Sequence, residues 1–268
     1  MVKTIKNILK LSLDKLGYEV RNKCQIESSD DPYCILSQVL DPISIKTIVD
    51  AGASIGKTSE KFSQIFPDAI VHAIEPYPPF YESLLKLAST NENIRIHNFA
   101  LSDFDGTEYL KVNQCEGTNS LLHTNRKSEK IFDDLLKTKD ELLVNTKKID
   151  SFVQSQDLKK IDILKLDLQG YELTAIKGAL QTLNKNQIGV ILCEIIFADL
   201  YQNQNSPIQL LQCLVENHSF KIFNFYQHHH HHGQLVQVEA ILFHSSIIKN
   251  IQSNFSKSFF PHSRLLIQ

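Results

Sequence analysis

The segment TIVDAGASIGKTSEKF, at 47–62, holds the residues of this chain whose types and spacing are most suited to chemistry. Within it, Ala51–Thr58 matches a loose phosphate-loop pattern of a small residue, four residues of any kind and then Gly-Lys-Thr. Such a loop wraps backbone N–H groups and a lysine around a polyphosphate at a helix N-terminus. The run ILKLD at 163–167 resembles the apolar strand with a terminal aspartate that would hold magnesium beside it. One interpretation is therefore a phosphate-loop nucleotide hydrolase.

The same segment also predicts a site for a different ligand. Asp50 directly precedes the loop, where its carboxylate would repel a triphosphate. Gly52 and Gly56 flank a tight turn, and Glu75 follows at the end of the next apolar run. An acidic residue roughly 20 residues beyond such a loop is where a ribose diol is bound in dinucleotide sites. Asp50 and Glu75 together suit a ligand with hydroxyls and an ammonium group, such as S-adenosylmethionine.

A dinucleotide site stays open as a third interpretation of the loop. It favours glycine at the middle position, where Ser54 stands, and it would place a pyrophosphate beside Asp50. A scaffold that binds no ligand is the fourth. In the adenosyl interpretation, Lys57 and Thr58 form only the first turn of a helix.

Apolar runs typical of buried strands alternate with segments of helical periodicity along most of the chain. The predicted strands are 47–51, 69–74, 94–99, 161–166 and 188–195, and the predicted helices are 57–66, 79–88, 171–183 and one that opens at Ser206-Pro207. Strands that alternate with helices form parallel βαβ units, so we expect an α/β fold with an open, mostly parallel sheet and helices on both faces. Two further strand-like runs, 220–226 and 235–243, flank QHHHHHGQ and predict a C-terminal antiparallel hairpin in which His228–His232 form a solvated loop.

One domain is expected from 46 to 245. It is preceded by an amphipathic helix and lead-in, 1–45, and followed by a tail, 246–268. Residues 107–150 are polar and lie where a single crossover connection is expected, which predicts an insertion or lid. Within this segment, Asn119-Ser120-Leu121 forms either part of a cover over a second substrate or an ordinary turn.

Composition restricts the classes of partner. The chain has 268 residues, a net charge of −2, 42% hydrophobic residues and 22% charged residues, as is usual for a soluble globular protein. A near-neutral balance lacks the basic face that nucleic acid requires. Five scattered cysteines without a C-x-x-C pair favour reduced thiols and a cytoplasmic location, and predict no structural zinc centre. The most apolar run carries Glu194 and is too short to span a bilayer.

Taken together, these segments resemble the FkbM-type family of class I S-adenosylmethionine-dependent methyltransferases. The resemblance is carried by VDAGASIGKTSEKF at 49–62, AIEPYP at 73–78, NFALSD at 98–103, KKIDSF at 147–152, IDILKLDLQGYELTAIKGA at 161–179 and ILCEI at 191–195. It implies a Rossmann-like, mostly parallel seven-stranded sheet. It also implies methyl transfer from S-adenosylmethionine to a hydroxyl of a sugar, a glycan or a secondary metabolite, with nitrogen as an alternative acceptor atom.

The resemblance also implies which residues bind the cofactor. They are Asp50, Gly52, Ala53, Ser54, Gly56, Glu75, Ala100 and Asp103. The loop residues would lie under the methionine part, Glu75 would accept from both ribose hydroxyls, and Asp103 would bind the exocyclic amine of adenine. Ser54 departs from the family, in which asparagine is common at this position, but a small polar residue still fits the turn.

Methyl transfer to a hydroxyl requires that its proton be removed, by a general base or with the help of a metal. Asp167 and Glu194 are the main candidates, because both approach the edge of the sheet where ligands bind. Glu172 is the third. Each is a possible base, and a pair of them is a possible site for a divalent cation. Asp167 is alternatively a cap of the LQGYE turn, and Glu172 alternatively neutralises the start of its helix. The rival functions are a nucleotide hydrolase and a non-catalytic module that binds an adenosyl ligand.

Overall fold

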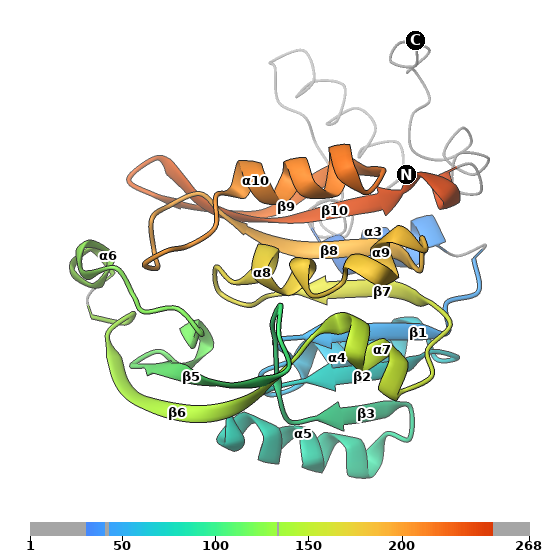
Figure 1. Cartoon of the computed structure of the whole chain (residues 1–268), viewed down its shortest axis with the longest axis horizontal. Coiled ribbons are helices and arrows are strands. Elements are labelled where there is room, and N and C mark those ends of the chain that lie inside the picture. Colours follow the sequence, from blue (N-terminus) through green and yellow to red (C-terminus); the bar gives the residue numbers. More distant parts are fainter. Residues whose placement is uncertain (1–30, 41–42, 133, 249–268) are drawn as a thin grey trace, which may run out of the picture.

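A seven-stranded sheet forms the centre of the computed structural model, which describes residues 31–40, 43–132 and 134–248 (Figure 1). The strand order is β3-β2-β1-β7-β8-β10-β9. The strands are β1 (Thr47–Ala51), β2 (Ile70–Ile74), β3 (Ile94–His97), β7 (Ile161–Leu166), β8 (Ile188–Ile196), β9 (Phe220–His231) and β10 (Gln234–His244). β10 is antiparallel to β8 and β9, and the other pairs are parallel. The predicted α/β fold with a C-terminal antiparallel hairpin is confirmed.

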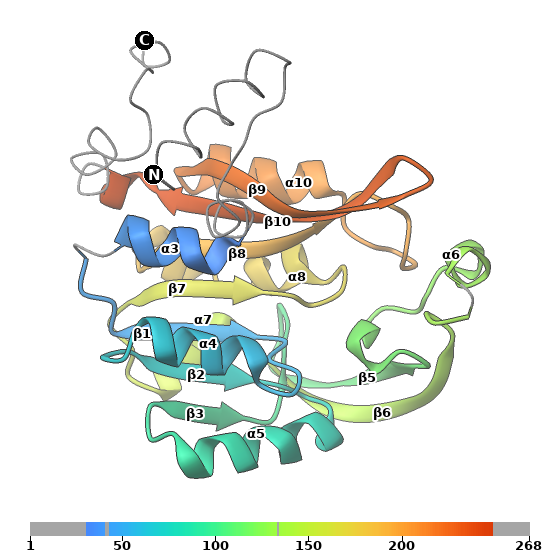
Figure 2. The same cartoon turned by 180° about the vertical axis from the view of Figure 1, so that it is seen from behind.

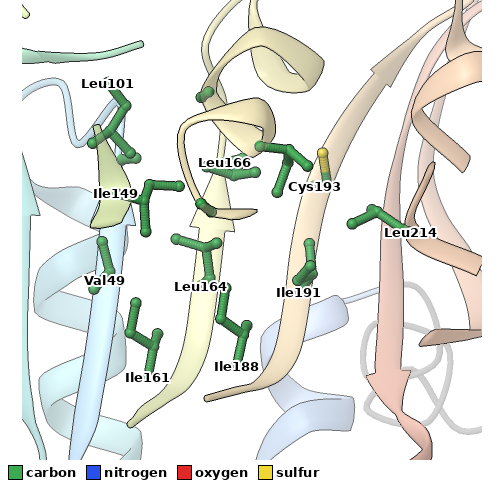
Figure 3. Close-up of a cluster of buried hydrophobic side chains, with 14 of the residues drawn as sticks. Val49, Leu101, Ile149, Ile161, Leu164, Leu166, Ile188, Ile191, Cys193 and Leu214 are labelled. Carbon is green, nitrogen blue, oxygen red and sulfur yellow. The ribbon is translucent and has the colours of Figure 1, made fainter. Parts of the chain in front are cut away.

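Continuous burial explains why the central strands have unbroken apolar sequences. Every residue of β7 and β8 is buried, as is expected where helices cover both faces of a parallel sheet. Figure 3 shows one of the resulting clusters. Val49, Leu164 and Ile191 come from three neighbouring strands, and Leu214 comes from the helical segment Cys213–Asn217 that packs on the sheet.

Helices cover both faces of the large sheet, as Figures 1 and 2 show from opposite sides. One face is packed by α3 (Pro32–Leu40), α4 (Lys57–Ile65) and α5 (Pro78–Thr90), and the other by α7 (Ile149–Ser155), α8 (Glu172–Lys177), α9 (Leu180–Asn184) and α10 (Pro207–Gln212). Within the three described ranges, every helix falls short of the length and apolarity that a membrane span requires. The helix predicted at the N-terminus lies outside the described residues.

The single helix predicted over 171–183 is wrong, because the chain forms α8 and α9 with a break between them. Gly178 lies against another segment there, and a Cβ atom on it would stand 2.1 Å from the carbonyl oxygen of Ser102. Asp150 then starts α9, since its carboxylate accepts from the backbone N–H groups of Gln181 and Thr182 at 2.9 and 2.8 Å. The chain therefore forms two helices, although its apolar residues have the spacing of one. The packing of Gly178 against Ser102 and the cap that Asp150 provides cause the break.

The segment 107–150 carries secondary structure of its own. β5 (Gly106–Asn113) and β6 (Thr138–Lys147) form an antiparallel pair, and β4 (Ala100–Leu101) adds to β6 in a three-stranded sheet of order β4-β6-β5. A short 3-10 helix, η1 (Glu116–Thr118), and α6 (Arg126–Ile131) lie between β5 and β6. Figures 1 and 2 show this smaller sheet beyond one end of the large sheet.

The histidine run lies mainly in a strand rather than in a loop. β9 extends through His231, and only His232 and Gly233 make the turn, with φ angles of 48° and 79°. Two consecutive residues with positive φ are what a two-residue hairpin turn requires. The predicted loop is therefore too long, although His228–His230 are exposed as expected.

Candidate active site

A pocket opens at the ends of β1, β2 and β7. The large sheet contributes Gly52, Ser54, Ile74, Glu75, Asp167, Leu168 and Gln169. The segment that includes the smaller sheet contributes Ala100, Leu101, Leu110, Glu116, Gly117, Asn119, Ser120 and Leu121. The pocket thus lies at the edge where strand C-termini meet and where α/β proteins bind their ligands.

Gly52 brings the loop after β1 against the end of β7. Its φ is 72°, and a Cβ atom there would stand 1.9 Å from the carbonyl oxygen of Asp167. No other residue allows this approach. Gly56 also has a positive φ, 92°, and an added Cβ would meet Leu84 and Leu87 at 2.8 and 2.6 Å. Gly52 therefore sets the shape of the pocket floor, and Gly56 allows the start of α4 to pack closely against α5.

Glu75 presents a buried carboxylate at the end of β2. It is 6% exposed. The backbone N–H of Ser54 donates to Oε2 at 2.8 Å, and the backbone N–H of Tyr77 donates to Oε1 at 2.9 Å. Burial raises the pKa of Glu75 to about 7, although the two N–H groups oppose this effect. Each oxygen keeps a lone pair with which it can accept a further hydrogen bond.

Asp50 lies beneath the loop instead of in the pocket, and it is fully buried. Ser59 Oγ donates to its Oδ2 at 2.6 Å, and Lys165 Nζ lies 3.5 Å from its Oδ1. Lys165 Nζ is also 3.4 Å from Oδ2 of Asp167 and donates to the carbonyl of Gly52 at 3.2 Å. Burial alone would lower the pKa of Lys165, but the carboxylates of Asp167 and Asp50 raise it well above its usual range. The ion pairs stabilise the loop from below.

The structure divides the residues expected to bind the cofactor into two groups. Those that line the pocket are Gly52, Ser54, Glu75 and Ala100. Those that do not are Asp50, Ala53 and Gly56, which are buried, and Asp103, which is exposed. Lys57, the lysine of the phosphate-loop interpretation, is exposed and also does not line this pocket.

Gln169 is the residue that sequence reasoning missed. Its Nε2 donates to Oδ1 of Asp167 and to Oε2 of Glu194, both at 2.8 Å. Its Oε1 accepts from the hydroxyl of Tyr201 at 2.8 Å. The sequence offered only a weak signal for this residue. A polar residue directly before Gly170 is typical of a turn, and Gln169 adopts a positive φ of 52° in that turn.

Only Asp167 of the three candidate catalytic residues lines the pocket. Glu172 Oε1 accepts from the backbone N–H groups of Leu168 and Gly170 at 2.8 and 3.2 Å, so it stabilises the turn. Glu194 accepts from Gln237 Nε2 at 2.8 Å as well as from Gln169. Glu172 and Glu194 line a separate, smaller pocket.

Burial raises the pKa of Glu172 to about 7 and, with the charges of Asp167 and Glu172, raises that of Glu194 well above its usual range. These carboxyl groups therefore retain protons at a pH where an exposed glutamate is ionised. Among the described residues, no group of three or more His, Cys, Asp and Glu side chains has an arrangement that could hold a metal ion.

The loop between β5 and α6 forms one wall of the pocket and is fastened at several points. The hydroxyl of Tyr77 and Nζ of Lys139 donate to Oε1 of Glu116 at 3.1 and 2.9 Å. Ser120 Oγ donates to the carbonyl oxygen of Gln169 at 2.8 Å. These contacts join the loop to residues that follow β2 and β7.

The site can be compared with known proteins. Residues 50–222 match the family model described as the methyltransferase FkbM domain. The chain is 27% identical over 197 residues to methyltransferase sdnD of Sordaria araneosa, covering 63% of this chain and 74% of that protein. It is 24% identical over 169 residues to the 2-O-methyltransferase NoeI of Sinorhizobium fredii, covering 61% and 67%. Among solved structures, the fibrillarin pre-rRNA processing protein of Methanococcus jannaschii aligns with 17% identity and a TM-score of 0.42, over 75% of this chain and 66% of that one.

Proposed function

This chain belongs to the FkbM methyltransferase family, and we propose that it transfers the methyl group of S-adenosylmethionine to a hydroxyl of a small molecule or a glycan. S-adenosylmethionine is proposed as the cofactor mainly because the carboxylate of Glu75 lines the pocket. Two backbone N–H groups hold this carboxylate in place and leave lone pairs for a ribose diol.

The rest of the pocket fits the same ligand. Gly52 leaves room beside the end of β7 that any Cβ atom would fill, and the methionine part would lie there. Phe80, Phe99, Ala100 and Leu101 form an apolar surface suited to adenine. The exposed position of Lys57 disfavours the rival nucleotide hydrolase, because the phosphates would have no lysine beside them.

Asp167 would accept the proton of the acceptor hydroxyl. When bound, the cofactor supplies an electrophilic methyl group on a sulfonium. Asp167 is the candidate base that faces the pocket, and Gln169 and Lys165 orient its two oxygens. Positioning of the hydroxyl at attack distance supplies most of the acceleration in such a displacement, and the base removes the positive charge that develops on the oxygen.

Calorimetric titration with S-adenosylmethionine, S-adenosylhomocysteine and magnesium ATP tests the cofactor. We expect micromolar binding of both adenosyl ligands, weakened at least tenfold in Glu75→Gln because the amide accepts the ribose hydroxyls less well than a carboxylate. The matched control is Glu82→Gln, an exposed glutamate on α5. Binding of ATP alone would indicate a phosphate loop, and hydrolysis of that ATP would establish the nucleotide hydrolase instead.

Transfer of a radioactive methyl group to a panel of methyl glycosides and small alcohols tests the reaction. Asp167→Asn is expected to lower the rate about 10²-fold or more while the affinity for S-adenosylhomocysteine stays within about threefold. The exposed Asp199 gives the control variant Asp199→Asn. Equal rates in Asp167→Asn and wild type would contradict the role of Asp167.

A further inference from the structure

Tyr201 touches two parts of the pocket from behind without lining it. It lies between β8 and α10, it is 2% exposed, and it lines neither of the two pockets described above. Its hydroxyl donates to Oε1 of Gln169 at 2.8 Å and lies 3.1 Å from the carbonyl oxygen of Thr118. Gln169 lines the pocket together with Asp167, and Thr118 belongs to the loop that forms one wall.

The hydroxyl of Tyr201 determines which way the side-chain amide of Gln169 points. Because the amide oxygen accepts from the phenol, both protons of Nε2 are directed at Oδ1 of Asp167 and Oε2 of Glu194, each at 2.8 Å. The opposite orientation would place the amide oxygen against both carboxyl groups, where it could accept only from a protonated one. Burial raises the pKa of the Tyr201 phenol well above its usual range, so the phenol keeps its proton and remains a donor.

The phenol is itself held in a fixed position. Tyr201 pairs with Thr124 in an isolated antiparallel β-bridge, and its backbone N–H donates to Oε1 of Gln204 at 3.3 Å. Its ring lies against Gly170, where an added Cβ atom would stand 3.1 Å from the ring carbon Cδ2. The carbonyl of Thr118 is a second acceptor beside the hydroxyl. A side chain held by packing and by hydrogen bonds from a second layer is what keeps a functional group in one geometry.

We propose that Tyr201 is a positioning residue, which acts through Gln169 to hold the carboxylate of Asp167 where it can accept the proton of the methyl acceptor. This inference rests on the proposed function, in which Asp167 is the base, and deepens it. A base removes a proton only from within hydrogen-bond reach of it, and small displacements at a reacting centre have large effects on rate. Tyr201 therefore influences the rate although it contacts neither substrate.

A double-mutant cycle in the methyl-transfer assay tests this connection. Rates are measured for wild type, Tyr201→Phe, Asp167→Asn and the double variant, with radioactive S-adenosylmethionine and the panel of methyl glycosides and small alcohols. Tyr201→Phe keeps the buried ring and removes only the hydroxyl. The control Tyr109→Phe removes a hydroxyl at an exposed position of β5 outside the pocket.

We expect Tyr201→Phe to lower kcat about five- to tenfold and to leave KM for both substrates within about twofold. In the Asp167→Asn background the same change should alter kcat by less than about twofold, because the lost hydrogen bond acts through that carboxylate. Tyr109→Phe should change neither quantity. A loss of equal size in both backgrounds, a loss confined to KM, or no loss at all would overturn the inference.

A second measurement requires no methyl acceptor. NMR spectra of protein labelled with nitrogen-15 glutamine report the side-chain amide protons of Gln169, which are assigned from their loss in Gln169→Met. We expect these protons to exchange with solvent at least about tenfold faster in Tyr201→Phe than in wild type, and at an unchanged rate in Tyr109→Phe. Equal exchange rates in Tyr201→Phe and wild type would show that the hydroxyl does not fix the amide, and would overturn the inference.

Failure of this inference and failure of the proposed function give different results. A wild type that methylates acceptors, without the selective effect of Tyr201→Phe, overturns this inference alone. A wild type that methylates no member of the panel overturns the proposed function and the role of Tyr201 in it. Thermal unfolding establishes that each variant is folded. If Tyr201→Phe does not fold, the cycle is run with Gln169→Met, which interrupts the same connection one residue nearer to Asp167, and equal losses in both backgrounds again overturn the inference.

Discussion

Asp167 and Glu194 share the side-chain amide of Gln169, whose Nε2 donates to one oxygen of each carboxyl group at 2.8 Å. Two acidic groups from neighbouring strands are thus connected through one neutral residue. Both protons of the amide are used, and its oxygen accepts from Tyr201. The orientation of Asp167 toward the pocket consequently depends on a residue that need not contact the substrate.

Replacement of Gln169 by glutamate is expected to destabilise the protein in a pH-dependent way. A third carboxylate beside Asp167 and Glu194 adds like-charge repulsion when ionised, whereas a protonated glutamate can still donate one hydrogen bond. We expect a loss of about 1 to 3 kcal/mol at pH 8 and a smaller loss at pH 5. Urea unfolding at both pH values measures this. The exposed Gln181 gives the control Gln181→Glu, and an equal loss at the two pH values would contradict the prediction.

The affinity for S-adenosylhomocysteine should fall as the pH is lowered from 8 to 6. Burial raises the pKa of Glu75 to about 7, so below that pH the carboxyl is mainly neutral and accepts hydroxyl donors less well. We expect the dissociation constant to rise about three- to tenfold over this interval, within the limit of tenfold per pH unit for one proton. Calorimetry at pH 6, 7 and 8 measures it. Glu75→Gln should bind more weakly with a flat profile, and a profile as steep as that of wild type would assign the titration to another group.

Glu239→Gln should stabilise the protein at high pH. Oε2 of Glu239 is buried without a hydrogen-bond partner among the described residues, and burial raises the pKa of the group to about 7 from an ordinary 4.5. A carboxyl with a raised pKa costs stability as the pH rises through that value, because the folded state holds the proton more tightly than the unfolded chain. We expect a gain of about 1 to 3 kcal/mol at pH 8 and a gain of less than about 1 kcal/mol at pH 5.

Chemical denaturation of Glu239→Gln and wild type at the two pH values measures this difference. Glu82→Gln, on the exposed side of α5, is the control and should change stability at neither pH. A loss of stability at pH 8 would show that the ionised carboxylate of Glu239 makes a favourable interaction with Lys165.

The contact between the buried His72 and the half-buried His97 is expected to make the protein sensitive to acid. Nδ1 of His72 and Nε2 of His97 are 3.0 Å apart, so the contact requires that one nitrogen be unprotonated. Burial lowers both pKa values to about 4 from an ordinary 6.5. At pH values between the ordinary pKa and the lowered one, the unfolded chain binds more protons than the folded chain. The free energy of unfolding therefore decreases as the pH falls through this interval.

Urea unfolding at pH 7, 5.5 and 4.5 tests the pair through a comparison of variants. The raised carboxyl pKa values act in the opposite direction over the same interval, so the informative quantity is the difference from wild type. His97→Gln should lose less stability between pH 7 and 4.5 than wild type does. The control His229→Gln, on the exposed hairpin, should lose as much as wild type does.

The sequence predicted the parts of the fold that depend on local pattern. Unbroken apolar runs such as β7 and β8 identify strands covered on both faces, and alternation with helices gives the parallel sheet. The division of the predicted helix at 171–183 was not predictable, because it depends on contacts of Gly178 and Asp150 with residues distant in the chain. The extent of β9 through His231 was missed for the same kind of reason, since pairing with β10 maintains a strand where the residue type suggests a loop.

Prediction of the site was limited in a similar way. Residue types and spacing identified Glu75 and Asp167, which line the pocket, because strand ends collect at one edge of a parallel sheet. The same reasoning cannot tell which side of a turn a carboxylate faces. Glu172 therefore looked like Asp167 in the sequence, although it bonds to its own turn. Gln169 has a positive φ of 52°, and the polar residue before Gly170 was too weak a signal to place its side chain between Asp167 and Glu194.

The two-residue strand β4 has a consequence for how this enzyme family can diversify. Ala100 and Leu101 pair with β6, and this pairing attaches the small sheet directly beside residues that line the pocket. The register of the large sheet is set elsewhere, by pairs among β1, β2 and β7. A descendant protein can thus keep the part of the pocket formed by β1, β2 and β7 while the segment of the smaller sheet beside it lengthens, shortens or is exchanged.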